Sequence, residues 1–346
     1  MSNSKSLKRT VLTSFIILFF LLLAGGGIIV YFLLAPNFTP RQTCYVYIYP
    51  DKDFNRLCLQ LKDSAACRNI NSFKQIAVFL KYPEKMKTGR YAVRPGMSNH
   101  DLLENLRRGN QEPVHITFNN IREKGELADR LADQLMLNSD ELSELMNDAD
   151  YCKSLDFETY TVKAMFIPNT YEVYWTISAE KLMQRMQHEY NSFWTEARRK
   201  KADKIGLSSV EVAILASIVE EESAVLDEYP VIAGLYINRL HRGIPLQADP
   251  TVKYAIGNFA LQRILKEHLE YESPYNTYLH EGLPPGPLRV PSIQSLDAVL
   301  NYKSHNYIYM CAKEDFSGRH NFAVTLTEHN KNANRYRAEL NRLGIR

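Results

Sequence analysis

An uncharged apolar stretch near the start most strongly limits what this 346-residue chain can fold into. No charged residue occurs from Thr10 to Ala35, and the sequence from Phe15 to Leu23 is apolar without a break. A helix of about 20 apolar residues crosses the hydrocarbon core of a bilayer. Residues 10–35 are therefore predicted to form a single transmembrane helix, and the folded part of the chain follows it.

The residues beside this stretch predict its orientation. Lys5, Lys8 and Arg9 precede it, and positive residues favour the cytoplasmic side. Residues 1–9 are thus expected to be a cytoplasmic tail, with the rest of the chain outside the cytoplasm. A cleaved signal peptide is the alternative. Apolar sequence continues through residues 28–34, past a cut at Ala24, and this favours an uncleaved anchor.

Composition argues against some partners and cofactors. A net charge of +3 is too small to indicate nucleic-acid binding. The nine histidines and five cysteines show no metal-site spacing, so neither a metal nor another cofactor is expected. Cys44, Cys58 and Cys67 lie close together in the sequence, and whether two of them form a disulfide is left open.

The overall prediction is an α+β fold with a small module at 36–113 and a larger, mainly helical domain with a small sheet at 114–346. Sequence patterns in the small module indicate a strand, two helices, a strand and a helix, at residues 43–49, 54–61, 71–79, 89–94 and 98–108. In the larger domain they indicate strands at 114–118 and 307–310, and helices at 124–136, 139–147, 179–205, 226–240 and 328–343.

Two segments of the larger domain are predicted to be loops. Residues 246–251 are expected to be non-helical, because Pro250 interrupts a helix and the Asp249 side chain can cap the next turn. Residues 275–291 are rich in proline, which fixes φ, so that loop is expected to be stiff.

The helix predicted to start after Ser208 ends in an unusual way. Ser208 and Glu211 form a capping-box pattern, and residues 210–219 are almost entirely apolar, so the helix should be buried on most sides. It ends in three consecutive glutamates, with no lysine or arginine nearby in the sequence: Glu220, Glu221 and Glu222. Because negative charge at a helix C-terminus is unfavourable, helix stability does not explain this cluster.

Helical spacing separates the three carboxylates. Glu222 continues the apolar stripe of Ile218 and Val219, and desolvation there should raise its pKa towards the range of a general acid. Glu220 lies over small residues, and Glu221 is expected to reach water. The alternative is that all three form a solvated, charged helix end.

Several motifs downstream carry a family resemblance. The pair Glu222–Ser223 resembles the Glu-Ser pair of lysozyme-like lytic transglycosylases. Five further segments follow in order: Tyr236–Leu240, Leu246–Val252, Tyr275–Tyr278, Gly282–Gly286 and His320–Phe322. Together they resemble the YceG-like endolytic murein transglycosylases, the MltG family. Where that family has a Pro-Asp-Thr-Tyr-like segment, this chain has Asn169 in place of the acid.

The resemblance implies an architecture and a reaction. The module at 36–113 would be LysM-like and residues 114–346 a YceG-like catalytic domain. The enzyme would be a lyase on the bacterial cytoplasmic (inner) membrane that cuts the bond between N-acetylmuramic acid and N-acetylglucosamine within nascent peptidoglycan strands. It would leave 1,6-anhydro ends and terminate elongation, near the peptidoglycan synthases.

The resemblance also implies site residues. Glu222 would be the catalytic acid and base, supported by Glu220 and Ser223. Substrate contacts would come from Asn238, Gln247, Asp249, Thr251, Tyr275, Asn276 and Tyr278, with Arg239, His320 and Asn321 as weaker candidates. Two alternatives remain. A hydrolase of the same bond would need a second carboxylate, for which Asp249 and Glu220 are candidates. A non-catalytic glycan-binding membrane scaffold would need none.

Overall fold

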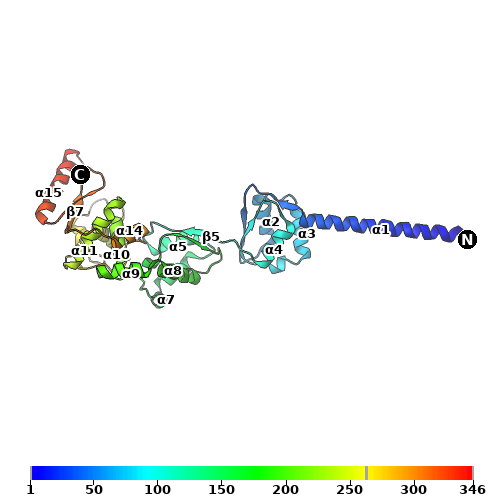
Figure 1. The fold of residues 1–346 in the computed structure, drawn as a ribbon, viewed down its shortest axis with the longest axis horizontal. Helices are drawn as coiled ribbons and strands as arrows, with labels where there is room; N and C mark the ends of the chain where they lie inside the picture. Colours follow the sequence, from blue (N-terminus) through cyan, green and yellow to red (C-terminus); the bar gives the residue numbers. More distant parts are fainter. Residues whose placement is uncertain (1, 262–263, 345–346) are drawn as a thin grey trace. The chain divides into compact units, whose positions relative to one another are not determined.

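The computed structural model describes residues 2–261 and 264–344, and the chain divides into two compact units (Figure 1). Unit 1 comprises residues 1–115 together with 172–176. Unit 2 comprises residues 116–171 and 177–346. Two short strands that pair with each other, β5 (Val114–Thr117) and β6 (Thr170–Val173), lie where the chain passes from one unit to the other.

Unit 1 begins with the apolar helix α1 (Ser2–Leu34), drawn in dark blue in Figure 1. Its part from Leu12 to Leu34 is long and apolar enough to cross a membrane. The end of α1 is fixed to the folded part of the unit, since the Asn99 side chain donates a 2.8 Å hydrogen bond to the carbonyl of Phe32. The predicted apolar helix is therefore present, but α1 starts earlier than residue 10, at Ser2.

The folded part of unit 1 follows the predicted order of elements. Its strands and helices are β1 (Pro36–Phe38), β2 (Cys44–Ile48), α2 (Phe54–Ser64), α3 (Ile70–Phe79), the 3-10 turn η1 (Pro83–Lys85), β3 (Gly89–Val93), β4 (Met97–Ser98) and α4 (Asn99–Arg108). β2 pairs antiparallel with β3, and β1 pairs antiparallel with β4. The result is a β-α-α-β unit, with α4 added, around one apolar core.

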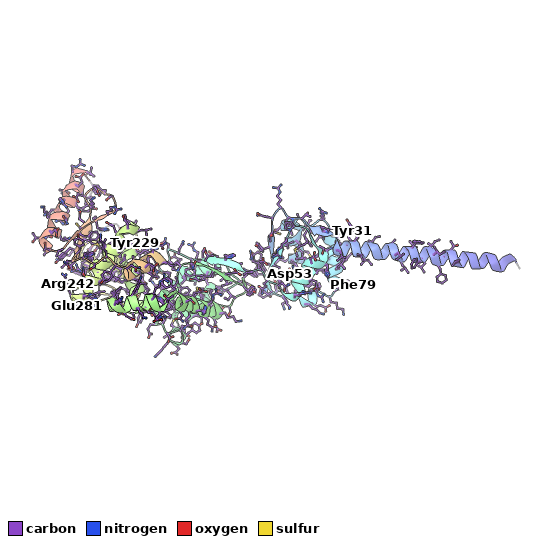
Figure 2. The ribbon with its side chains drawn as sticks, in the orientation of Figure 1. Tyr31, Asp53, Phe79, Tyr229, Arg242 and Glu281 are labelled. Carbon is purple, nitrogen blue, oxygen red and sulfur yellow. The ribbon has the colours of Figure 1, made fainter. Side chains whose placement is uncertain are left out.

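Local capping explains why these helices start where they do. Asp53, labelled in Figure 2, accepts hydrogen bonds from two backbone N–H groups of the first turn of α2. Ser98 and Asp101 form a reciprocal capping box at the start of α4. The five cysteines of the chain are all free thiols, so no disulfide joins Cys44, Cys58 and Cys67.

Unit 2 is mainly helical with small two-stranded sheets. Its helices are α5 (Lys124–Ala132), α6 (Ser139–Asn147), α7 (Ala149–Ser154), α8 (Ala179–Phe193), α9 (Glu196–Ile205), α10 (Ser209–Glu222), α11 (Tyr229–His241), α12 (Asp249–Ile256), α13 (Lys266–Leu269), α14 (Ile293–Leu300) and α15 (Leu326–Arg342). The described part of unit 2 also contains the 3-10 turns η2 (Val162–Met165) and η3 (Leu226–Glu228), and the antiparallel pair β7 (Tyr309–Ala312) and β8 (His320–Ala323).

The single helix predicted over residues 179–205 is wrong. The chain leaves the helical conformation at Trp194 and Thr195, so that α8 and α9 are separate helices. The Thr195 backbone is extended, and its side chain accepts a hydrogen bond from the N–H of Arg198, which makes it an N-cap. Trp194 is 2% exposed. Burial of this large ring and the threonine cap together interrupt a sequence whose helical propensity is otherwise continuous.

The loop predicted at 246–251 is also partly wrong, because α12 begins at Asp249. Pro250 occupies the first turn of this helix, where its missing N–H removes no helical hydrogen bond. Asp249 does not cap the helix through its side chain, which instead accepts a 2.6 Å hydrogen bond from the Tyr278 hydroxyl.

Helix α10 packs against α11, α12 and α14; α10, α11 and α14 are labelled in Figure 1. The capping box of Ser208 and Glu211 is confirmed, and every residue from Val212 to Val219 is buried. The Ser217 hydroxyl accepts a 2.9 Å hydrogen bond from the N–H of Leu288, so α10 also holds the proline-rich loop. The last turn of α10 thus projects from a rigid core.

Candidate active site

The three glutamates at the end of α10 line three different hollows of unit 2. Glu220 lines one of about 810 Å³, Glu221 one of about 130 Å³ and Glu222 one of about 370 Å³. This separation follows from helical geometry, which turns successive side chains by about 100° around the axis. We call the hollow beside the third glutamate the Glu222 cleft.

Glu222 is half-buried in the wall of its cleft. The hydroxyl of Tyr236, on α11, donates a hydrogen bond to its Oε1 atom. Burial raises the pKa of Glu222 to about 7; the hydrogen bond from Tyr236 lowers it in part, and the nearby Asp249 raises it further. A carboxylic acid that keeps its proton up to about pH 7 can serve as a general acid near neutral pH.

Glu221 is partly exposed, at 17% of its side chain, and it is also paired with two arginines. Its carboxylate accepts two 2.9 Å hydrogen bonds from the guanidinium of Arg122 and one of 3.0 Å from Arg289. These arginines precede Glu221 by 99 residues and follow it by 68, so they are not neighbours in the sequence. Glu221 therefore joins the end of α10 to Arg122 and Arg289.

Glu220 is occupied by a different set of donors. Its Oε2 atom accepts hydrogen bonds from the backbone N–H of Ser292 at 2.7 Å and from the hydroxyl of Ser295 at 2.8 Å, at the start of α14. The guanidinium of Arg289 lies 3.5 Å from its other oxygen. Glu220 therefore joins α10 to α14. Asn169 lines the same hollow as Glu220, and its side chain accepts a hydrogen bond from the N–H of Thr170.

Three of the sequence-predicted substrate residues line the Glu222 cleft: Gln247, Asp249 and Tyr278. Gln247 has a left-handed backbone with φ of +50°, and its side-chain oxygen accepts a 2.5 Å hydrogen bond from Arg239. Arg239 also donates to the carbonyl groups of Pro245 and Ile308. Burial first, and then the adjacent Asp249, raise the pKa of the Tyr278 hydroxyl. It remains a neutral donor to Asp249.

The remaining predicted substrate residues are not among those that line the Glu222 cleft. Thr251 and Asn276 are fully buried: Thr251 bonds to Thr277 at 2.8 Å, and Asn276 donates to the carbonyl groups of Leu269 and Tyr271. Asn238 donates to two carbonyl groups of the segment that leads to β7, those of His305 and Tyr307. Tyr275 packs against Tyr254, with ring centroids 4.7 Å apart. Ser223, which ends α10, is buried and donates to Glu228. 

Sequence reasoning assigned no individual role to Tyr236, although it lies in one of the motifs that carry the resemblance. It follows Glu222 by fourteen residues on the next α-helix, so no helical spacing connects them. Two weaker substrate candidates, His320 and Asn321, lie at the start of β8. His320 lines the Glu222 cleft, while Asn321 donates to Glu314 at 2.6 Å.

Comparison with known proteins identifies similar chains. The model of the YceG-like family matches residues 46–335. An endolytic murein transglycosylase of Bacillus subtilis is 28% identical over 285 residues, which are 77% of this chain and 78% of the relative. One of Streptococcus pneumoniae serotype 2 is 25% identical over 296 residues, 75% of this chain but 52% of that protein.

One solved structure is also similar. It is the crystal structure of a YceG-like protein of Listeria monocytogenes, with a TM-score of 0.52 and 26% sequence identity. The similarity covers 84% of this chain and 99% of that one. The fold and the sequence therefore point to the same group of proteins.

Proposed function

The chain belongs to the YceG-like family, and on that premise we propose that it is a membrane-anchored endolytic murein transglycosylase in which Glu222 is the catalytic acid and base. The curated relatives carry the name of that activity. Such enzymes are lyases that act on peptidoglycan, so the substrate is the glycan strand of the cell wall.

The reaction requires one group that can give a proton and take one back. Protonated Glu222 donates its proton to the leaving glycosidic oxygen as the bond from C1 of N-acetylmuramic acid breaks. The C6 hydroxyl of the same sugar then attacks C1, which closes the 1,6-anhydro ring. Its proton passes to the Glu222 carboxylate, and this restores the starting state. No water molecule and no second nucleophile enter the product.

The observation that carries this proposal is the contrast between Glu222 and its two neighbours. Glu221 is paired with Arg122 and Arg289, and Glu220 accepts hydrogen bonds from two serines. Glu222 has a hydroxyl as its donor, lines an open cleft and has a pKa of about 7. Of these three carboxyl groups, it is the one suited to hold and release a proton near neutral pH.

Other residues of the cleft have proposed roles around this acid. We assign contacts with the sugars to Gln247, Asp249 and Tyr278, because their polar groups line the cleft. Asn238, Thr251, Tyr275 and Asn276 support its walls. Glu220 keeps the end of α10 in place, and Ser223 acts through Glu228. Hydrolysis of the same bond is a second candidate, since Asp249 lies in the same cleft as Glu222.

The rest of the chain fits an enzyme that works at the bacterial cytoplasmic membrane. α1 would be its single-pass anchor, with the N-terminus in the cytoplasm and residues 36–346 outside. The β-α-α-β arrangement of unit 1 supports its assignment as a LysM-like module at 36–113, followed by the catalytic domain at 114–346. From this position the enzyme would cut newly made strands, terminate their elongation and act near the synthases that make them.

Product analysis tests the proposed reaction. The full-length protein in detergent is incubated with purified peptidoglycan in water enriched in ¹⁸O, and the fragments are analysed by mass spectrometry. A lytic transglycosylase leaves 1,6-anhydro ends without ¹⁸O. Reducing ends that contain ¹⁸O would establish the hydrolase. Binding of the protein to peptidoglycan without any cleavage would support a scaffold.

A further inference from the structure

A buried carboxylate lies beside the Glu222 cleft and has no role in the reaction as described so far. Glu228, in η3, is 5% exposed. Its oxygens accept hydrogen bonds from the Ser223 hydroxyl at 3.2 Å, the backbone N–H of His320 at 2.9 Å and Nδ1 of His320 at 3.0 Å. Within the described ranges, no lysine or arginine forms an ion pair with it. His320 is thus its principal polar partner.

The hydrogen bond to Glu228 fixes the orientation and tautomer of the His320 imidazole. A carboxylate can only accept, so Nδ1 carries a proton and donates it to the hydrogen bond. In the neutral ring Nε2 is then an acceptor. The backbone is held equally firmly, because His320 starts β8 opposite Ala312 of β7. The ring cannot rotate without breaking its bond to a buried carboxylate.

His320 also lines the Glu222 cleft, whose wall contains both His320 and Glu222. No residue in the described part of the chain forms a hydrogen bond with Nε2 of His320. Histidines that bind metals use the same arrangement, in which a carboxylate holds one ring nitrogen, fixes the tautomer and leaves the other nitrogen free to act as an acceptor.

We infer that His320 is a substrate-binding residue whose Nε2 accepts a hydrogen bond from a hydroxyl or amide hydrogen of the glycan. Glu228 is its positioning residue, and Ser223 orients Glu228 in turn. This inference rests on the proposed function. The two residues of the Glu-Ser pair at the end of α10 then have different roles. Glu222 acts on the glycosidic bond, while Ser223 positions Glu228, which in turn positions His320.

A purely structural role is the alternative. His320 could serve only to attach β8 to η3. In that case a substitution that preserves the attachment would preserve activity, whichever ring nitrogen carries the proton. Glu228→Gln separates the two roles. The glutamine oxygen can still accept from the backbone N–H of His320, while its amide group donates to Nδ1. The imidazole proton then moves to Nε2, so that the acceptor in the cleft becomes a donor.

The test compares full-length wild type, Glu228→Gln and His320→Phe by kcat/KM on peptidoglycan, by thermal unfolding and by ¹⁵N NMR of histidine-labelled protein. Asp227→Asn is the matched control, since it makes the same type of change one residue away at an exposed ion pair with Arg319. The expected loss of kcat/KM is about tenfold to a hundredfold for both Glu228→Gln and His320→Phe, from one lost hydrogen bond that leaves a buried donor unpaired. The control stays at the wild-type rate.

The NMR signal of His320, identified by its absence in His320→Phe, should show the proton on Nδ1 in the wild type and on Nε2 in Glu228→Gln. The inference is overturned if Glu228→Gln moves the proton but keeps wild-type kcat/KM, or if it loses activity without moving the proton. A Glu222→Gln variant that retains activity would instead remove the proposed function on which the inference rests.

Discussion

Tyr236 donates the hydrogen bond of its phenol to Oε1 of Glu222, from one buried helix to the end of another. Burial and this bond act on the carboxyl group in opposite directions. Burial raises the pKa of Glu222, while a donor to the carboxylate lowers it, and the balance lies at about 7. The pair therefore sets the pH range in which the carboxyl group can act as an acid.

The pH profile should show the loss of this acid at high pH. Glu222 is protonated below its pKa, so kcat/KM should be constant on the acidic side and fall above about pH 7. The decline should be close to tenfold per pH unit. Measurement of initial rates of strand cleavage from pH 5 to pH 9 checks it. A profile in which activity rises through this range would mean that the essential group is a base in the free enzyme.

Tyr236→Phe should shift that profile. The substitution keeps the ring and removes the donor that stabilises the Glu222 carboxylate, so the pKa of Glu222 should rise and the decline should begin at a higher pH. Tyr309→Phe is a suitable comparison, since Tyr309 lines the same cleft without a hydrogen bond to Glu222 among the described contacts. An unchanged midpoint in Tyr236→Phe would show that the hydroxyl does not control the acid.

Glu222 should also lower stability at alkaline pH. Its folded-state pKa lies above its unfolded value of 4.5, so the folded form loses stability as pH rises above that unfolded value, and the loss is complete above about pH 7. Glu222→Gln removes the ionisation, and its gain in unfolding free energy should reach about 1–3 kcal/mol at pH 8. Thermal unfolding at pH 5 and pH 8 should show a larger difference at pH 8, and an equal difference at both would contradict the raised pKa.

Glu221 should contribute to the free energy of unfolding rather than to catalysis. Glu221→Gln leaves Arg289, whose side chain is 9% exposed, without its full ion pair. Loss of one member of a buried pair is costly, so the variant should lose roughly 2–4 kcal/mol. The exposed pair of Lys200 and Glu196 provides the control, since Glu196→Gln should change stability by less than about 0.5 kcal/mol. Equal melting temperatures for the two variants would contradict this assignment.

Gly286 should be intolerant of any side chain. A Cβ atom there would lie 1.9 Å from the carbonyl oxygen of Tyr160, so the backbone would have to move. Gly286→Ala should therefore destabilise unit 2 by several kcal/mol, on the order of other severe packing errors. Gly125 lies in α5 with open space around it, and Gly125→Ala should be neutral or stabilising. The difference in thermal unfolding between the two variants is the measurement.

The sequence predicted best what is determined locally. Helix caps such as Ser208 with Glu211 placed the start of α10, and the apolar stripe singled out Glu222 among three adjacent glutamates. Sequence-based prediction failed where residues far away in the chain determine a contact or a helix boundary. Arg122 and Arg289 reach Glu221 from other parts of the chain, and no spacing rule connects them to it. The break at Thr195 depends on the burial of Trp194, which is a tertiary effect.

Motif resemblance selected residues around the end of α10 but did not distinguish those that line the Glu222 cleft from those that are buried. Asp249 and Thr251 lie two residues apart, yet Asp249 lines the Glu222 cleft and Thr251 is fully buried. On α12 two positions correspond to about 200° of rotation, so one side chain faces the cleft when the other faces the core. Only the packing of the helix determines which is which.

The most direct test of the central claim is the yield of 1,6-anhydro ends from purified peptidoglycan, compared among full-length wild type, Glu222→Gln, Glu221→Gln and Glu211→Gln. If Glu222 supplies the proton, Glu222→Gln should lose about a thousandfold in rate, in the middle of the range that general acid catalysis contributes. Glu221→Gln and Glu211→Gln should still form 1,6-anhydro ends, at rates reduced only in proportion to the fraction of each variant that is folded. A Glu222→Gln protein that still forms anhydro ends at a comparable rate would contradict the account.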